Sequence, residues 1–309
     1  MKANLVKPVD PSRGDMKLSI ILPCYNAADT VGTQLEALAN QDGIVSPDVE
    51  VIFVENGSRD TSRAIAEQYL DRLPNLHIVD ASAHRGRPQA RNAGAKAATG
   101  DVLLFCDADD EVAPGWLTAM SQAFATHEFV ACRFDVEKLN YPWLQQARGT
   151  PQQDALPRLW YPPFLLYGGG SSLGITRALH QAVGGFDETL PFLEDAEYCV
   201  RVQQHTGKEL HFVRDAMVHI RHRTSLAGLY SQARSWGQYN QLLFKRYRSG
   251  PSDDSLRWRA YIAEWLRLLR YLSHSVRNKE GRVRLIWQVG WQIGILKGAL
   301  RYRVPPVSV

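Results

Sequence analysis

Three carboxylates follow a short apolar run and are the most chemically suggestive feature of this 309-residue chain. Residues 102–106 are too few for a helix and predict a strand buried on both faces. Asp107, Asp109 and Asp110 come directly after it, and their like charges need compensation. Oxygen ligands suit Mn²⁺ or Mg²⁺, and open α/β sheets bind ligands just outside the carboxyl ends of their strands. The run therefore indicates a divalent-cation site, with a solvated acidic turn as the alternative.

Two further groups could recognise a nucleotide. Glu55 and Asn56 end another apolar run, where a carboxylate could accept a hydrogen bond from a nucleobase imide N–H. The alternative is a plain turn that enters a helix. Arg85, Arg87 and Arg91 precede the acidic strand, and guanidinium groups are suited to binding a diphosphate. For these arginines the alternative is a solvated, basic start of a helix.

A second acidic pair and a histidine lie later in the chain. Glu194 and Asp195 open a predicted helix, where a carboxylate stays ionised and could take a proton from an acceptor hydroxyl. The alternative is a helix cap. His219 ends a strand-like segment, and a neutral imidazole could complete a metal shell of aspartates. A structural histidine is the alternative, and the choice depends on whether the fold returns His219 to Asp109.

The first half of the chain alternates short apolar runs with amphipathic segments. This order is typical of a parallel sheet with helices on both sides. The predicted strands are residues 17–23, 49–54, 76–79 and 102–106, and helices are expected over 31–38, 65–73 and 88–98 and from Pro114 onward. The element order thus predicts an α/β fold whose mostly parallel central sheet is flanked by helices.

The middle of the chain is less regular. Residues 140–167 contain five prolines without a clear period and predict a long loop. Beyond it, the sequence predicts a strand through Ile175, a helix from Arg177, a helix that begins at Glu194, and strand pieces at 210–213 and 217–220.

The C-terminal part is basic and amphipathic. Between Arg214 and Arg303 there are 18 Lys and Arg against 5 Asp and Glu, although the whole chain has a formal charge of only +4. Apolar residues recur at helical spacing, at Trp258, Ile262, Trp265, Leu269, Leu272 and Val276 and again at Val289, Ile293, Leu296 and Leu300. The pattern predicts helices that lie on an anionic membrane surface, or an ordinary helical pair packed on the rest of the chain.

Composition bounds the cellular setting. Hydrophobic residues make up 45% and charged residues 22% of the chain, which is ordinary for a globular protein. Cys24, Cys106, Cys132 and Cys199 form no CxxC pair and are expected to be buried free thiols in a reducing compartment. The first residues lack the apolar core of a signal peptide, and no run of 18 apolar residues occurs. We therefore expect a cytoplasmic protein that is either free or peripheral on the inner face of the cytoplasmic membrane.

The order of these motifs resembles that of the family-2 glycosyltransferases, inverting enzymes with the GT-A fold. The resemblance covers about residues 18–224. The matching pieces are SIILPCYN at 19–26, VIFVENGSRDTS at 51–62, Arg85-Gly86 with ARNAG at 90–94, DADD at 107–110, and VGGFDE at 183–188 leading to Glu194-Asp195. Five such pieces in the right order and spacing are a specific signal, whereas one alone would be weak.

The resemblance implies roles for individual residues, which we state as expectations. The donor would be bound by Pro23, Tyr25, Glu55, Asn56, Arg87, Arg91, Asp107 and Asp109, with the first three framing the nucleotide base. Asp107 and Asp109 match the DxD motif and would hold Mn²⁺ or Mg²⁺ together with His219. Asp195 matches the catalytic base. Gly169, Gly170, Trp160 and Glu194 are expected to bind the acceptor. The family usually has Asp-Asp where this chain has Glu55-Asn56, which leaves the nucleotide base open.

The predicted function is metal-dependent, inverting transfer of a sugar from a UDP-, GDP- or dTDP-linked donor to a glycan, lipid-linked or small-molecule hydroxyl. Nucleic acid is not an expected partner. A nucleotidyltransferase or other NTP-binding enzyme is one alternative, although no glycine-rich phosphate loop follows the first strand. A non-catalytic carbohydrate-binding scaffold is another. The predicted organisation is a tail over 1–16, a catalytic domain over 17–250 with halves 17–135 and 136–250, and a basic helical extension over 251–309.

Overall fold

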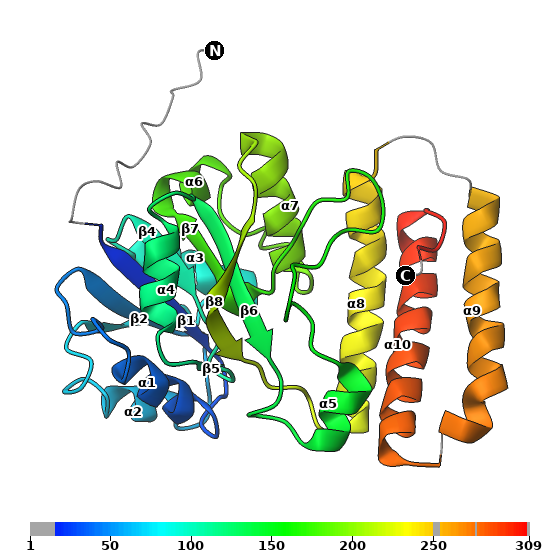
Figure 1. Cartoon of the computed structure of the whole chain (residues 1–309), viewed down its shortest axis with the longest axis horizontal. Helices are drawn as coiled ribbons and strands as arrows, with labels where there is room; N and C mark the ends of the chain where they lie inside the picture. Colours follow the sequence, from blue (N-terminus) through cyan, green and yellow to red (C-terminus); the bar gives the residue numbers. More distant parts are fainter. Residues whose placement is uncertain (1–15, 250–253, 276, 308–309) are drawn as a thin grey trace. The chain divides into compact units, whose positions relative to one another are not determined.

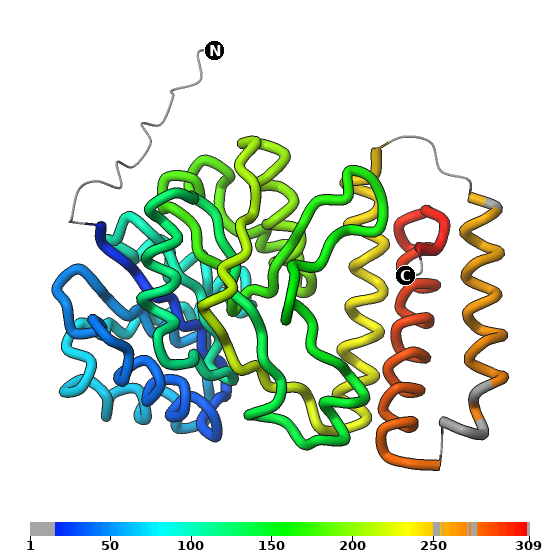
Figure 2. The backbone as a smooth tube through the Cα atoms, in the orientation of Figure 1, coloured from blue at the N-terminus to red at the C-terminus, as the bar shows by residue number. Residues whose placement is uncertain are grey.

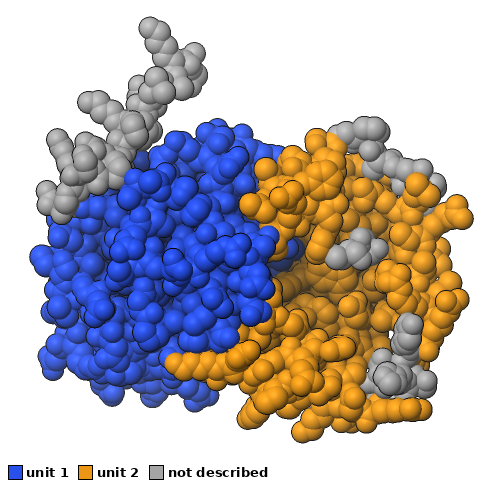
Figure 3. Space-filling view, viewed as in Figure 1, with its two compact units in different colours: residues 1–135, 152–156, 167–220 blue, residues 136–151, 157–166, 221–309 orange. Residues whose placement is uncertain are grey.

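The computed structural model describes residues 16–249, 254–275 and 277–307 (Figures 1 and 2). The chain divides into two compact units (Figure 3). The first unit comprises Met1–Asp135, Gln152–Leu156 and Tyr167–Ile220, and the second comprises Val136–Pro151, Pro157–Leu166 and Arg221–Val309. Nearly all of the predicted tail over 1–16, and Val276 of the predicted helical stripe, lie outside the described residues.

An eight-stranded sheet forms the centre of the described part of the first unit, in the order β3-β2-β1-β4-β7-β6-β8-β5. The strands β3, β2, β1 and β4 are parallel, as are β6 and β8, whereas β7 and β5 run antiparallel to their neighbours. The predicted mixed, mostly parallel sheet is confirmed. The strands are β1 (Leu18–Cys24), β2 (Val49–Glu55), β3 (Leu76–Asp80), β4 (Val102–Phe105), β5 (Glu111–Val112), β6 (Phe129–Asp135), β7 (Leu173–Thr176) and β8 (His211–His219).

Helices cover both faces of this sheet because successive strand side chains point to opposite sides. On one face, Ile20 and Leu22 of β1 belong to the same core as Leu35 and Trp116. On the other, Phe105 of β4 meets Phe186 edge to face with ring centroids 5.2 Å apart. The first face carries α1 (Val31–Ala39), α2 (Ser62–Glu67) and α4 (Trp116–Ala123), and the second carries α3 (Arg87–Ala97), α6 (Arg177–Ala182) and α7 (Glu194–Thr206) (Figure 1).

The strand pieces predicted at 210–213 and 217–220 are one strand, β8. Its pairing with β6 shifts register between Cys132 and Arg133, which pair with Val213 and Met217. Three extra β8 residues are accommodated there, including the charged Arg214 and Asp215, so the alternating apolar pattern is interrupted although the strand continues. The irregularity explains why the sequence pattern showed two pieces.

The second unit is helical. It contains α5 (Pro142–Arg148), α8 (Leu226–Tyr247), α9 (Asp254–Ser275) and α10 (Lys279–Tyr302), with α10 between α8 and α9 (Figure 1). The prediction of a featureless loop over 140–167 was wrong at α5, whose Leu144 packs with Leu229 and Val283. Pro142 lies in the first turn of that helix, where a missing N–H has no cost. Packing also places α8 in this unit, although the predicted helical extension began only at residue 251.

Three glycines spaced four residues apart on α10 allow its backbone to approach α8 closely. A Cβ at Gly290 or Gly298 would lie 2.8 Å or 2.5 Å from the carbonyl oxygen of Tyr230 or Gln238. A Cβ at Gly294 would overlap the carbonyl oxygen of Arg234. Backbone atoms cannot move aside as flexible side chains do, so any larger residue must separate the two helices.

We predict that Gly294→Leu destabilises the second unit. Overpacking of this kind costs about 1–3 kcal/mol or more, even though leucine has a higher helix propensity than glycine. Hydrogen exchange followed by mass spectrometry should show faster exchange in α8 and α10. Lys297→Leu is the control, because Lys297 is exposed on the same helix. Unchanged protection of α10 in Gly294→Leu would contradict this account of the helix contact.

All four cysteines are buried and unbridged, as the sequence predicted. No helix within the described residues is both long enough and apolar enough to cross a membrane.

Candidate active site

The acidic turn after β4 brings three carboxylates together. Ligand oxygens of Asp107, Asp109 and Asp110 all lie within 4.8 Å of one another. The backbone N–H of Asp110 donates to the carbonyl of Asp107 at 3.3 Å, which folds the turn. Asp109 is exposed, Asp107 half-buried and Asp110 buried. A set of three carboxylates is the donor chemistry of a hard divalent cation, so these residues fit Mn²⁺ or Mg²⁺. Asp110 joins the pair that the DxD resemblance suggested.

Arg91 connects this turn to the start of α7. Its guanidinium lies 2.8 Å from Asp107 Oδ1 and 2.9 Å from Glu194 Oε1, while the side chain is 2% exposed. Burial acts to lower the pKa of Arg91, but the carboxylates of Asp107, Glu194 and Asp195 outweigh it and raise that pKa. The arginine predicted to bind the donor is therefore held by two protein carboxylates, and the predicted contact with donor remains a prediction.

The first residues of α7 present two carboxylates in different settings. Leu193, which precedes them, adopts the left-handed conformation with φ 58°, which is uncommon outside glycine. Glu194 is buried, and burial and Asp195 raise its pKa to about 7 against the opposing effect of Arg91 and Arg87. Asp195 is only half-buried and accepts hydrogen bonds from the N–H groups of Gly170 (3.0 Å) and Ala196 (2.8 Å). Asp195 is thus the more accessible of the two.

The turn that contains Gly169 and Gly170, before β7, packs against the start of α7, where Gly170 N–H donates to Asp195. A Cβ at Gly170 would overlap the Arg91 guanidinium, so a larger residue there would push Arg91 away from its two carboxylates. Gln152 orders the turn by accepting from Gly169 N–H at 2.9 Å and donating to Ser172 Oγ at 2.7 Å. Sequence reasoning missed Gln152, because it lies in the segment predicted as a loop and no periodic signal marks it.

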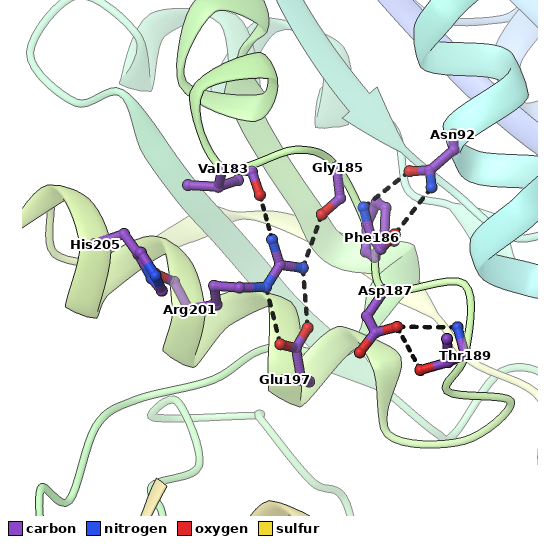
Figure 4. Close-up of polar contacts among 9 residues, drawn as sticks. All are labelled: Asn92, Val183, Gly185, Phe186, Asp187, Thr189, Glu197, Arg201 and His205. Carbon is purple, nitrogen blue, oxygen red and sulfur yellow. Dashed lines mark hydrogen bonds and ion pairs between the residues drawn. The ribbon is translucent and has the colours of Figure 1, made fainter. Parts of the chain in front are cut away.

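The loop over residues 183–189 is fixed from two helices (Figure 4). From α3, Asn92 accepts from Phe186 N–H at 2.8 Å and donates to the Phe186 carbonyl at 2.9 Å. From α7, Arg201 donates to the carbonyls of Val183 (2.5 Å) and Gly185 (2.8 Å) while it is paired with Glu197. Two adjacent residues of α3 thus hold different parts of the site. Arg91 pairs with Asp107 and Glu194, and Asn92 is hydrogen-bonded to the loop over residues 183–189.

Glu55 and Asn56 lie at the carboxyl end of β2 and are buried. Glu55 Oε1 accepts from Ser58 N–H at 2.5 Å. Its Oε2 is buried without a hydrogen-bond partner among the described residues, which is an acceptor suited to a ligand N–H. Asn56 is occupied by the following loop, because it donates to the carbonyls of Ala81 and His84 and accepts from Gly86 N–H.

The remaining predicted donor residues lie on the same side of the sheet. Tyr25 is exposed and follows β1, and the Arg85 guanidinium lies 5.8 Å from the centre of its ring. Pro23 is half-buried, and Arg87 is exposed at the first position of α3. Arg85 was among the arginines noted for a diphosphate but not among the expected donor residues, and its contact with Tyr25 adds it to the candidates.

Of two further predicted residues, one returns to the neighbourhood of the acidic turn and the other belongs to the second unit. Glu111, which directly follows Asp110, pairs with His219 where β5 runs beside β8. His219 is buried at the end of β8, with Nδ1 2.6 Å from Asp135 Oδ2. It is not a member of the only group of three or more potential ligands found among the described residues. Trp160 is exposed and belongs to the second unit. Their predicted contacts with metal and acceptor remain predictions.

A family model described as glycosyl transferase family 2 matches residues 19–182, more than half of the chain. The chain belongs to this family. Among curated relatives, it is 36% identical over 138 residues to the uncharacterized glycosyltransferase YibD of Escherichia coli, covering 44% of this chain and 37% of YibD. It is also 36% identical over 98 residues to the poly(ribitol-phosphate) beta-N-acetylglucosaminyltransferase TarS of Staphylococcus aureus, covering 31% and 17% of the two chains. The matches thus span little more than a third of YibD and about a sixth of TarS.

Solved structures establish the fold of this family-2 protein. The mannosyltransferase PcManGT of Pyrobaculum calidifontis, in complex with GDP-Man and Mn²⁺, superimposes with a TM-score of 0.66 at 19% identity over 96% of this chain and 90% of that one. S. aureus TarS 1–349 in complex with UDP-GlcNAc gives a TM-score of 0.53 at 16% identity over 94% and 93%. The predicted GT-A fold and family are both confirmed.

Proposed function

We propose that this protein is a metal-dependent, inverting glycosyltransferase that moves a sugar from a nucleoside-diphosphate sugar to an acceptor hydroxyl. The observation that carries the proposal is the bridge formed by Arg91. One buried guanidinium contacts Asp107 of the acidic turn and Glu194 beside Asp195. A leaving-group site and a base therefore belong to one fixed constellation, as a single displacement requires.

The donor would bind along the carboxyl ends of β1, β2 and β4. The unpaired Glu55 Oε2 would accept the imide N–H of the base, and Tyr25 with Arg85 would border it. Asp107, Asp109 and Asp110 would hold Mn²⁺ or Mg²⁺ at the diphosphate. When bound, that cation neutralises charge that builds on the departing diphosphate. The exposed Arg87 adds positive charge near the same end.

Asp195 would act as the base. Its carboxylate takes the proton of the acceptor hydroxyl, whose oxygen forms a bond to the anomeric carbon from the face opposite the diphosphate. The bond to the diphosphate breaks in the same step, and the nucleoside diphosphate leaves with the electron pair. One displacement inverts the anomeric configuration and needs no covalent intermediate. Gly170 N–H and the start of α7 hold Asp195 in place, and the buried Glu194 fixes Arg91.

The remaining assignments concern His219, the donor class, the acceptor and the location. His219 would reach a metal only through Nε2, since Asp135 occupies Nδ1. UDP-, GDP- and dTDP-linked sugars are the proposed donors, and solved neighbours in complex with GDP-Man and UDP-GlcNAc support the first two classes. The proposed acceptor is a glycan, a lipid-linked or a small-molecule hydroxyl, and Gly169 and Trp160 stay candidates for its contacts; the name of TarS gives poly(ribitol-phosphate) for that relative. We propose a cytoplasmic location for the reaction, because the four cysteines are buried and unbridged, as is usual in a reducing compartment.

The experiment that tests this function is a thermal-shift screen of UDP, GDP and dTDP with and without Mn²⁺. We expect one nucleotide to stabilise the protein only when Mn²⁺ is present. At a ligand concentration one hundred times Kd the gain is about 2.7 kcal/mol, or about 5–10 °C in Tm for a domain of this size. Stabilisation by no nucleotide, or by nucleotide equally with EDTA, would count against a metal-dependent donor site.

Asp109→Ala should abolish the Mn²⁺-dependent part of this shift, because it removes the most exposed carboxylate of the acidic turn. Without nucleotide, its Tm should stay within about 2 °C of the unmodified protein, since exposed substitutions usually change stability by less than about 0.5 kcal/mol. Asp71→Ala is the matched control, an exposed aspartate of the same unit outside the site. A full nucleotide shift in Asp109→Ala would remove Asp109 from the metal site.

A further inference from the structure

One side of α9 carries a continuous row of exposed apolar side chains. Its members are three or four residues apart and are between 38% and 63% exposed. On an ideal helix they occupy an arc of about 120°. We call this row the outer stripe, and it consists of Trp258, Ile262, Leu266, Leu269 and Leu272. Apolar residues at this spacing ordinarily face a core, so their exposure calls for an occupant.

The packing of α9 within its unit is centred to one side of the outer stripe, at Tyr261, which lies about 80° from the middle of the stripe on an ideal helix. Tyr261 is 4% exposed and its hydroxyl donates to the Gln292 carbonyl of α10 at 3.0 Å. That contact fixes which side of α9 meets α10. The outer stripe is therefore not the helix-packing surface of this unit, and the sequence prediction of an ordinary packed pair does not account for it.

Basic residues border the stripe. Arg259 and Arg270 are exposed next to Leu266 on an ideal helix, and neither has an ion-pair partner in the part of the chain that is described. Arg267 does not belong to this border, because it lies on the opposite side of an ideal helix and pairs with Glu264 at 3.0 Å. The border is thus positively charged, within a C-terminal region where Lys and Arg outnumber Asp and Glu 18 to 5.

We propose that the outer stripe docks this protein onto the surface of an anionic phospholipid bilayer. The apolar side chains would enter the boundary between headgroups and acyl chains, Trp258 would lie at the interface, and Arg259 and Arg270 would meet lipid phosphates. A second copy is a poorer occupant, because an antiparallel pair of α9 helices would set these arginines against those of its partner. The proposal goes beyond glycosyl transfer and does not depend on it.

Vesicle flotation of the full chain, without donor, tests the docking face. The protein should float with phosphatidylcholine vesicles that contain phosphatidylglycerol and much less with phosphatidylcholine alone. Leu266→Glu should lower the apparent affinity at least about tenfold, since a charge at the acyl boundary is costly. Leu256→Glu is the matched control with the same charge change on the same helix, because Leu256 is equally exposed but lies off the stripe. It should change affinity less than about twofold. Equal losses in both variants would overturn the proposal, as would a wild-type protein that does not float.

A charge variant gives a second, independent measure. Arg259→Gln with Arg270→Gln should weaken binding to the anionic vesicles by about fivefold per arginine, and added salt should weaken wild-type binding in the same direction. Light scattering after gel filtration examines self-association. A dimer that Leu266→Glu converts to monomer, with flotation unchanged, would assign the stripe to a second copy and overturn the bilayer. Nucleotide thermal shifts should be unaltered in all these variants, which separates this test from that of the transfer function.

Discussion

Asp195→Asn should reduce kcat by about 10³-fold or more while donor binding is retained, which corresponds to about 4 kcal/mol of transition-state stabilisation. The amide cannot take up the acceptor proton. Its single oxygen can keep one of the two hydrogen bonds that Gly170 and Ala196 N–H groups donate to separate oxygens of Asp195, so we expect the start of α7 to stay folded. The measurement is single-turnover release of nucleoside diphosphate beside a Mn²⁺-dependent thermal shift with the same nucleotide.

The comparison that isolates the base is with Glu194→Gln. Glu194 is adjacent in sequence but buried against Arg91. Its substitution should lower Tm and leave the remaining folded enzyme with a larger kcat than Asp195→Asn. Full activity of Asp195→Asn on the true acceptor would show that another group takes the proton. Loss of the nucleotide shift in that variant would instead assign Asp195 to donor binding.

Arg91→Met should be the most destabilising single substitution in the site. It leaves Glu194 and Asp107 without their shared counter-charge, and removal of one partner of a buried ion pair costs about 3–5 kcal/mol. Denaturant unfolding followed by circular dichroism would measure the loss. Arg63→Met is the surface control, because Arg63 and Glu67 form an exposed pair worth less than about 1 kcal/mol.

A double variant separates stability from positioning. Replacing both partners, as in Arg91→Met with Glu194→Leu, removes the buried charge pair and should recover at least half of the lost stability. Turnover should stay low, since nothing then joins Asp107 to the start of α7. Recovery of turnover together with stability would show that Arg91 serves folding alone. If stability did not recover, the loss of unfolding free energy in Arg91→Met would not come from the broken Arg91–Glu194 contact.

Local sequence patterns were sufficient to predict most strands and helices and to place the acidic residues at the edge of the sheet. Each strand from β1 to β4 is a short apolar run whose carboxyl end bears polar residues, and parallel strands bring such ends to one edge. Asp107, Asp109 and Glu55 could be placed on that ground, and the ordered family motifs added Asp195. These inferences need only neighbours in sequence and the general geometry of a parallel sheet.

Long-range partners were not accessible in the same way. Arg91 pairs with Glu194 across 103 positions, and a sequence pattern cannot distinguish that pair from an arginine facing a diphosphate. Gln152 and α5 lie in a proline-rich segment whose prolines looked like loop residues, although Pro142 begins a helix. Asn56, which stays a predicted donor residue, also holds the loop over residues 81–86, and no sequence pattern showed that contact. Each difference comes from a contact between distant segments.

The most direct measurement of the central claim is the anomeric configuration of the first sugar released. With Mn²⁺ and an α-linked nucleotide sugar chosen from the thermal-shift screen, proton NMR within the first minutes should show the β-anomer, formed with water as acceptor, together with the nucleoside diphosphate. EDTA should stop both. Release of the α-anomer first would contradict a single displacement at Asp195, and undiminished release in EDTA would contradict the role of the acidic turn.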